Sequence, residues 1–150
     1  MAALLVIAHA PLASSLHAVA AHVYPDCSRQ LASLDIEAGA SLEQVEADVR
    51  AALAALEGRE VLILVDVFGA TPCNAARELA DGVRIRVVAG VNVPMLWRSL
   101  CYADLPLAEL AARAVDGGIK GVTHVPPERP QQNQSIPAPR NDQVEHPHQQ

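Results

Sequence analysis

The sequence is short of basic residues, cysteines and aromatic residues. Lys and Arg number 11 against 17 Asp and Glu, which gives a formal net charge of −6. Nucleic acids and anionic membrane surfaces attract proteins with basic patches, so this charge balance disfavours both as partners. The three cysteines, Cys27, Cys73 and Cys101, have no C-x-x-C spacing. A sparse, odd set of this kind suits a reduced, cytoplasmic protein.

Long hydrophobic runs are also missing. The densest apolar run, residues 61–65, is far shorter than the roughly 20 residues that a membrane-spanning helix needs. The apolar start of the chain, residues 1–10, lacks the basic segment of a secretory signal, and a buried strand explains it better. We therefore expect no membrane span and no export signal.

Small apolar residues are abundant instead. Hydrophobic residues make up 51% of the 150 residues, and alanine alone supplies 27 of them, whereas aromatic residues make up 3%. This length fits one ordinary domain with a sizeable core. The composition predicts a core of closely packed Ala, Leu and Val with few large side chains.

The composition changes once along the chain, after Val125. Residues 126–150 contain six of the eleven prolines and six glutamines, but only Ile136 and Val144 as β-branched aliphatic residues. Such a segment buries too little apolar surface to offset the entropy of ordering it. We predict a folded domain over residues 1–125 and a disordered tail over residues 126–150. His146 and His148 lie in this tail and, without a third ligand, are not expected to bind metal.

Strand-like and helix-like patterns alternate along the predicted domain. Continuous apolar runs, typical of strands buried on both faces, alternate with segments whose apolar residues recur at helical spacing. The predicted strands cover residues 3–8, 31–36, 60–66, 84–89 and 119–125. The predicted helices cover residues 12–23, 41–58, 74–80, 94–101 and 107–115. This alternation predicts an α/β fold whose mostly parallel sheet is covered by helices on both faces.

Two local signals support the bounds of the predicted helix over residues 41–58, and the missing motifs disfavour a nucleotide-binding site. Ser41 followed by Gln44 has the spacing of a capping box, and Gly58 is expected to close the helix that it opens. Residues 117–121, GGIKG, read as a glycine-rich turn, because no phosphate-binding loop motif is present. Dinucleotide-binding and nucleophile-elbow motifs are missing too. No set of metal ligands is visible, so we expect neither a metal nor a cofactor.

Two polar residues stand at strand ends, where parallel α/β sheets place their chemistry. His9 is the first polar residue after the first strand, and Asp66 ends the third as the only charge in residues 61–76. If the strand order is 2-1-3-4, these strands are neighbours and the two side chains face each other. The carboxylate would then hold one ring nitrogen and leave the other as a nucleophile or base. Taken separately, His9 could be an ordinary strand-end histidine and Asp66 a turn or helix cap.

The loop of residues 67–74 adds a second element. Gly69 and Ala70 permit close approach to the backbone, and Thr71 stands where an N-cap is expected, with Pro72 in the first helical position. Free amides and a hydroxyl at a helix N-terminus suit a phosphoryl group, although the same residues could merely start a helix. Cys73 is explained at least as well by a small buried side chain as by a reactive thiol.

Three segments together resemble a known family. LLVIAHAPLASSL, VLILVDVFGATPCNAA and VVAGVNVPML, in this order and spacing, are similar to the IIA component of the mannose-type sugar phosphotransferase system, over residues 3–125. The resemblance implies that His9 accepts a phosphoryl group from the phosphocarrier protein HPr and passes it to a IIB component. It implies that Asp66 orients the imidazole. The residues that would lie against the phosphohistidine are Gly69, Ala70, Thr71 and Asn74.

The resemblance also implies a homodimer. The last strand, residues 119–125, would cross to pair in antiparallel fashion with the partner's sheet.

Three residues depart from the family's usual pattern. Ala10, Ala70 and Thr71 stand where the family commonly has Gly, Gly and Ser. The alanines each add a methyl group near the phosphoryl position, and threonine keeps the hydroxyl. Phosphorylation is therefore still expected, at an unknown rate.

Two other functions stay open at this point. The first is a regulatory module in which phosphorylation of His9 changes what the dimer binds while no sugar is moved. The second and weaker one is a flavodoxin-like domain that binds a small ligand without phosphate chemistry. Phosphoryl labelling distinguishes the relay from the ligand-binding domain, which would not be labelled. Discharge of the label to a IIB acceptor distinguishes the relay from the regulatory module.

Overall fold

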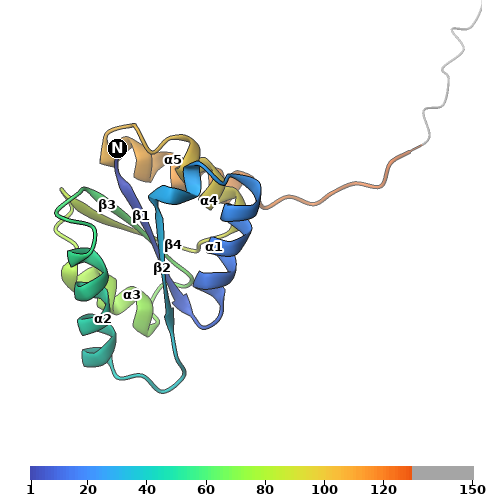
Figure 1. The fold of residues 1–150 in the computed structure, drawn as a ribbon. Coiled ribbons are helices and arrows are strands. Elements are labelled where there is room, and N and C mark those ends of the chain that lie inside the picture. The colour runs from blue at the N-terminus through green and yellow to red at the C-terminus, as the bar shows by residue number, and fades with distance from the viewer. Residues whose placement is uncertain (130–150) are drawn as a thin grey trace, which may run out of the picture.

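The first four apolar runs of the chain form one parallel sheet in the computed structural model, which describes residues 1–129 (Figure 1). The strands are β1 (Ala3–His9), β2 (Leu31–Ile36), β3 (Val61–Val65) and β4 (Ile85–Ala89). Their order is β2-β1-β3-β4, with every neighbouring pair parallel. The fold class and the 2-1-3-4 order predicted from the sequence are confirmed.

Helices cover both faces of the sheet. They are α1 (Leu12–Val23), the short 3-10 helix η1 (Cys27–Gln30), α2 (Leu42–Ala54), α3 (Thr71–Leu79), α4 (Val93–Cys101) and α5 (Leu107–Lys120). Figure 1 shows α2 and α3 on one side of the sheet and α1, α4 and α5 on the other. No helix within residues 1–129 combines the length and the apolar character that a membrane crossing requires.

The core consists of two clusters, one on each face of the sheet. In β1, Leu4 and Val6 belong to the cluster beneath α1, α4 and α5, whereas Leu5 and Ile7 belong to the cluster beneath α2 and α3. Because successive strand residues point to opposite faces, burial on both faces makes the whole strand apolar. The buried apolar side chains within residues 1–129 include no aromatic residue, as the composition predicts.

The parallel register brings three strand ends to one edge. Ile7 of β1 pairs with Val65 of β3, and Val65 pairs with Ala89 of β4. The residues at and just beyond these strand ends therefore lie side by side. They include His9, the last residue of β1, and Asp66, the first residue after β3, so the sheet itself brings the two together.

Most element bounds agree with the sequence patterns, and α2 shows where one differs. The Ser41 hydroxyl oxygen accepts a hydrogen bond from the Gln44 amide at 3.2 Å, as the capping spacing predicts. The helix ends at Ala54, before the expected stop at Gly58. Residues 55–58 form turns, in which Glu57 and Gly58 have φ values of 54° and 71°. The helix therefore ends before the position that the glycine alone indicates.

The C-terminal elements differ more strongly from prediction. Helix α5 continues to Lys120, so residues 117–120 are helical and do not form the glycine-rich turn expected there. A Cβ on Gly117 would lie 2.7 Å from Arg98 Cβ, which shows that this glycine lets α5 approach α4 closely. Residues 122–129 form neither helix nor strand. The predicted strand over residues 119–125 is not formed in the single chain, because the helix occupies its start and no strand pairs with the rest.

The predicted tail falls largely outside the described structure. Residues 121–129 are exposed and lead away from the helices (Figure 1). Residues 130–150, with His146 and His148, lie outside the described residues. The assignment of residues 126–150 as a disordered tail therefore stays a prediction.

We expect Gly117→Ala to destabilise the protein by about 1–3 kcal/mol, since the added methyl group overpacks the α4–α5 contact. Urea denaturation would measure the loss. Gly118→Ala is the matched control, because its Cβ would meet mainly the flexible end of Met95, at 2.7 Å from Cε. We expect a smaller loss there. A Gly117→Ala protein as stable as the native one would show that helix propensity outweighs packing at this position.

Candidate active site

His9 and Asp66 make direct contact at the carboxyl ends of β1 and β3. His9 Nδ1 lies 2.6 Å from Asp66 Oδ2, and the His9 backbone amide donates to the same oxygen at 3.0 Å. The other oxygen, Asp66 Oδ1, accepts from the Val67 amide at 2.9 Å. The contact expected from the strand order is present, and both carboxylate oxygens are engaged.

This contact determines which ring nitrogen is available. An ionised carboxylate can only accept hydrogen bonds, so His9 Nδ1 carries the hydrogen and Nε2 is the nitrogen with a free lone pair. The His9 side chain is 52% exposed, whereas that of Asp66 is 12% exposed. The imidazole is therefore anchored on one side by Asp66, while about half of the His9 side chain stays open to solvent.

Asp66 is held in its charged form. Burial by itself raises the pKa of this carboxyl, but the hydrogen bonds from the His9 amide and ring and from the Val67 amide outweigh it. The resulting pKa lies below the ordinary value for aspartate. At neutral pH the site accordingly contains a carboxylate aimed at the imidazole.

The loop after Asp66 is held by α3. Gly69 has φ +86°, a conformation that glycine adopts without strain, and its carbonyl accepts a hydrogen bond from Asn74 Nδ2 at 3.2 Å. The backbone N–H of Asn74 also donates a hydrogen bond to the Ala70 carbonyl at 3.0 Å. Asn74 therefore has a clear structural role in shaping the loop. Cys73 is buried in the core cluster beneath α2 and α3, as expected of a small packed side chain.

The start of α3 differs from the sequence prediction. Ala70 occupies the N-cap position with φ −85° and ψ 168°, Thr71 is the first helical residue, and proline follows within the first turn. Thr71 is thus not the N-cap, because the extended backbone that a cap requires falls one residue earlier. No side chain caps this helix, and the Thr71 hydroxyl is not used for that purpose. The first-turn amides of α3 have no side-chain acceptor.

The third sequence motif has a structural role next to the site. Gly90 and Val91 both donate backbone amides to the Val65 carbonyl at 3.0 Å, which ties the end of β4 to β3. Asn92 caps α4 by accepting from the Met95 amide at 2.9 Å. Its Nδ2 also donates to the Gly118 carbonyl of α5 at 3.1 Å. The contacts of Gly90, Val91 and Asn92 are thus structural: they hold the end of β4 and the start of α4 in place.

Sequence reasoning assigned no role to four residues near the site. The Ser14 amide, in the first turn of α1, donates to Asp35 Oδ1 at 3.0 Å, and hydrogen bonds from Ser14 lower the pKa of this carboxyl. A carboxylate at a strand end next to a helix start is a signal that could have found it. Phe68 and Arg77 form a cation–π contact at 5.6 Å, which no spacing in the sequence indicates.

The other histidines and the acidic residues of the described chain do not gather around a common point. Within residues 1–129, no group of three or more His, Cys, Asp or Glu is arranged to hold a metal ion. His17, on α1, lies with its Nδ1 3.1 Å from the Ser33 hydroxyl. The histidine that the structure brings together with a carboxylate is His9.

The strand order and the site at the strand ends define a doubly wound α/β protein of the flavodoxin-like type. The family model "EIIA-man: PTS system fructose IIA component" matches residues 3–115. The chain therefore belongs to this family of phosphotransferase-system IIA components, as its sequence motifs predict.

Individual relatives agree with this assignment. The chain is 40% identical over 93 residues to the "PTS system mannose-specific EIIAB component" of Escherichia coli K12, covering 59% of this chain and 29% of that protein. It is 47% identical over 49 residues to the "PTS system fructose-specific EIIA component" of Bacillus subtilis, covering 32% of this chain and 34% of that protein. These alignments span only about a third of the curated relatives.

Solved structures share the fold. The mannose/sorbose-specific IIA subunit from Enterococcus faecalis matches with a TM-score of 0.77 and 27% identity, covering 85% of this chain and 97% of that one. The EIIA component from Streptococcus agalactiae matches with a TM-score of 0.74 and 19% identity, covering 83% and 97%. The second likeness concerns the fold alone.

We expect Asp66→Asn to reduce the free energy of unfolding by about 1–3 kcal/mol at neutral pH, because the hydrogen bonds to a charged acceptor are lost. The folded pKa of Asp66 lies below its unfolded value of about 3.9. Its stabilisation is therefore complete above the unfolded pKa and is lost as pH falls through the folded pKa.

Urea denaturation between pH 7 and pH 3 measures this dependence. The difference in stability between the native protein and Asp66→Asn should shrink as the pH falls below about 4. Asp104→Asn, which changes an exposed carboxylate, is the control. A difference that stays constant with pH would contradict the assigned hydrogen bonds.

Proposed function

We propose that the protein relays a phosphoryl group, which His9 accepts from phospho-HPr and passes to a IIB component of a sugar phosphotransferase system. The observation that carries this proposal is the contact of His9 Nδ1 with Asp66, which leaves Nε2 as the free nitrogen of a half-exposed ring. Membership of the IIA family supports phosphoryl transfer in general. HPr as donor, IIB as acceptor and the cytoplasm as location are parts of the proposal.

The transfer needs only the two histidines as reacting groups. Nε2 of His9 attacks the phosphorus of the phosphohistidine on HPr, in line with the nitrogen–phosphorus bond that breaks. The donor imidazole leaves as the new bond to Nε2 forms, so no oxidant, metal or further reactant is required. Asp66 stays ionised and stabilises the positive charge that develops on the His9 ring. The acceptor side chain on IIB then attacks the same phosphorus in line, and the bond between phosphorus and His9 Nε2 breaks, which returns His9 to its starting form.

The loop before α3 would stabilise the phosphoryl oxygens. The first-turn amides of α3 lack a side-chain cap, and the Thr71 hydroxyl is not used as one. Amides at a helix N-terminus favour an anion, and each well-placed donor typically contributes a few kcal/mol to a charged transition state. We assign this role to the loop of Gly69, Ala70 and Thr71, with Asn74 holding the Gly69 carbonyl.

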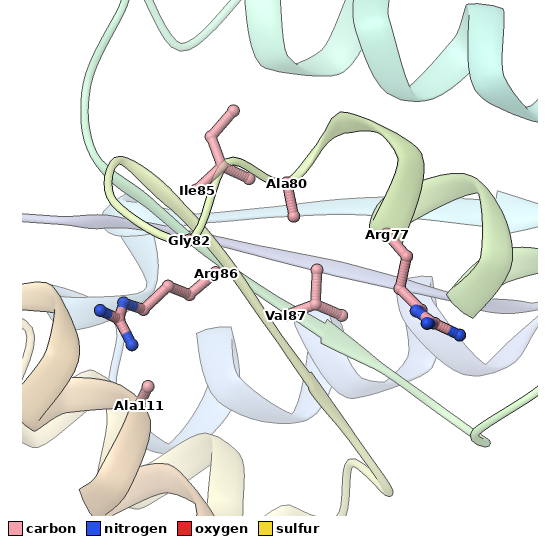
Figure 2. A pocket seen from close by; sticks show the side chains of 7 residues that line it. All are labelled: Arg77, Ala80, Gly82, Ile85, Arg86, Val87 and Ala111. Atoms are coloured by element: carbon pink, nitrogen blue, oxygen red, sulfur yellow. The ribbon is translucent and has the colours of Figure 1, made fainter.

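We further propose a homodimer in which residues 121–125 of each copy pair with β4 of the other. Strand β4 is the last strand of the sheet, so its outer edge carries unpaired backbone groups. A cavity of about 360 Å³ lies along this edge, where Ile85, Arg86 and Val87 line it (Figure 2). Val122 and Val125 are exposed in the single chain. Strand pairing would satisfy the edge and cover both valines.

The relay is tested by incubating the protein with phosphorus-labelled phospho-HPr. The native protein should acquire acid-labile, base-stable phosphate, whereas His9→Ala should acquire none. His17→Ala is the matched control and should label normally. Label that appears on His9 but never discharges to a IIB acceptor would favour a regulatory phospho-switch. Normal labelling of His9→Ala would overturn the site assignment.

The dimer is tested by light scattering on the eluted protein. We expect twice the mass of one chain for the native protein and a single-chain mass for Val122→Asp/Val125→Asp, because charges cannot be buried along the strand pair. Val23→Asp, at the end of α1, places one charge on another exposed valine and should stay dimeric. A monomeric native protein would rule the arrangement out.

A further inference from the structure

The only phenylalanine of the chain is exposed beside the site. Phe68 is 73% exposed, and it follows Asp66 by two residues. Its neighbour Val67 is exposed as well, and so is Leu12, which begins the helix after His9. Aromatic residues are rare in this sequence, and Tyr24 and Tyr102 pack partly buried against the core, whereas Phe68 is exposed. An exposed ring of this kind is typical of an anchor in a protein interface.

Helix α3 holds the exposed loop by two adjacent contacts. The Asn74 amide group binds the Gly69 carbonyl at 3.2 Å, and the Arg77 guanidinium lies 5.6 Å from the centre of the Phe68 ring. Asn74 and Arg77 are three residues apart and therefore lie on the same face of the helix. Each side chain fixes one residue of the loop. The position of the Phe68 ring consequently depends on Arg77.

Arg77 has no competing ion pair that would explain its placement. Among residues 1–129, the ion pairs are His9–Asp66, Arg98–Asp116 and Lys120–Asp116. Figure 2 shows Arg77 extending from α3 at one side of the cavity along β4, well separated from Arg86. The cation–π contact with Phe68 is the interaction that links Arg77 to the loop after Asp66.

We propose that Phe68, Val67 and Leu12 form the docking patch for the phosphorylated carrier protein, and that Arg77 is the positioning residue of this patch. The proposal rests on the proposed relay function. The three apolar side chains lie within three residues of the His9–Asp66 pair along the chain. A protein that delivers a phosphoryl group to Nε2 must cover this surface. The cation–π contact keeps the Phe68 ring oriented before the partner arrives, which lowers the cost of ordering it on binding.

The test is the rate of phosphoryl transfer as a function of phospho-HPr concentration. Arg77→Gln should raise KM about two- to fivefold, the range of an exposed cation–π contact, with kcat unchanged. Arg77→Lys keeps a cation and should restore most of the loss. Phe68→Ala removes the anchor and should raise KM about tenfold or more. Because Arg77 acts through Phe68, Arg77→Gln/Phe68→Ala should be no worse than Phe68→Ala alone.

Two controls separate docking from general effects. Arg113→Gln removes the same charge and a similar contact, since Arg113 lies 4.8 Å from the Tyr102 ring, and should leave KM unchanged. Phosphoramidate, a small phosphoryl donor that needs no docking surface, should label native protein and Arg77→Gln at equal rates.

The outcomes distinguish the two proposals. If neither phospho-HPr nor phosphoramidate labels His9, the relay function itself fails. If both label His9 but Arg77→Gln keeps the native KM, the positioning role of Arg77 is overturned while the relay stands. Additive effects of Arg77→Gln and Phe68→Ala would likewise overturn it.

Discussion

The contact between Asp66 and His9 is the constraint on which the site depends. A largely buried carboxylate is unfavourable unless its oxygens are hydrogen-bonded, and here the imidazole and two backbone amides satisfy both of them. The contact exists only because β1 and β3 are adjacent parallel strands whose ends are level. It also decides which ring nitrogen is free, since a ring held at Nδ1 leaves Nε2 unengaged. Sheet topology, carboxylate stability and the choice of the free ring nitrogen are therefore one connected feature.

The two helical layers support this edge in different ways. Beneath α2 and α3, the side chains of α3 shape the loop that borders the imidazole, through Asn74 and Arg77. On the other face, Asn92 links the start of α4 to α5, and Gly117 lets these helices approach closely. The first layer shapes the loop that follows Asp66. The second layer joins the start of α4 to α5.

The fold could be predicted from the sequence because the sheet is buried on both faces. Such burial requires uninterrupted apolar runs, and a polar residue at the end of such a run, such as His9, is conspicuous. Glycine was less informative, because Gly117 resembles a helix stop but serves helix packing in α5. Local spacing also placed the N-cap at Thr71, whereas the backbone places it at Ala70. The first error arose where a tertiary contact outweighs local preference, and the second where the helix begins one residue earlier than the spacing indicates.

The sequence by itself predicted the α/β class from its periodicity and the family from its three motifs. It predicted the pairing of His9 with Asp66 only on condition that the strand order is 2-1-3-4, which the structure has. Only the tertiary structure decided which histidine nitrogen is free, that Asp35 serves the start of α1, and that Phe68 lies exposed against Arg77. These features depend on distances between particular atoms of separate elements. Local spacing does not encode such distances, because they are fixed only when the layers pack together.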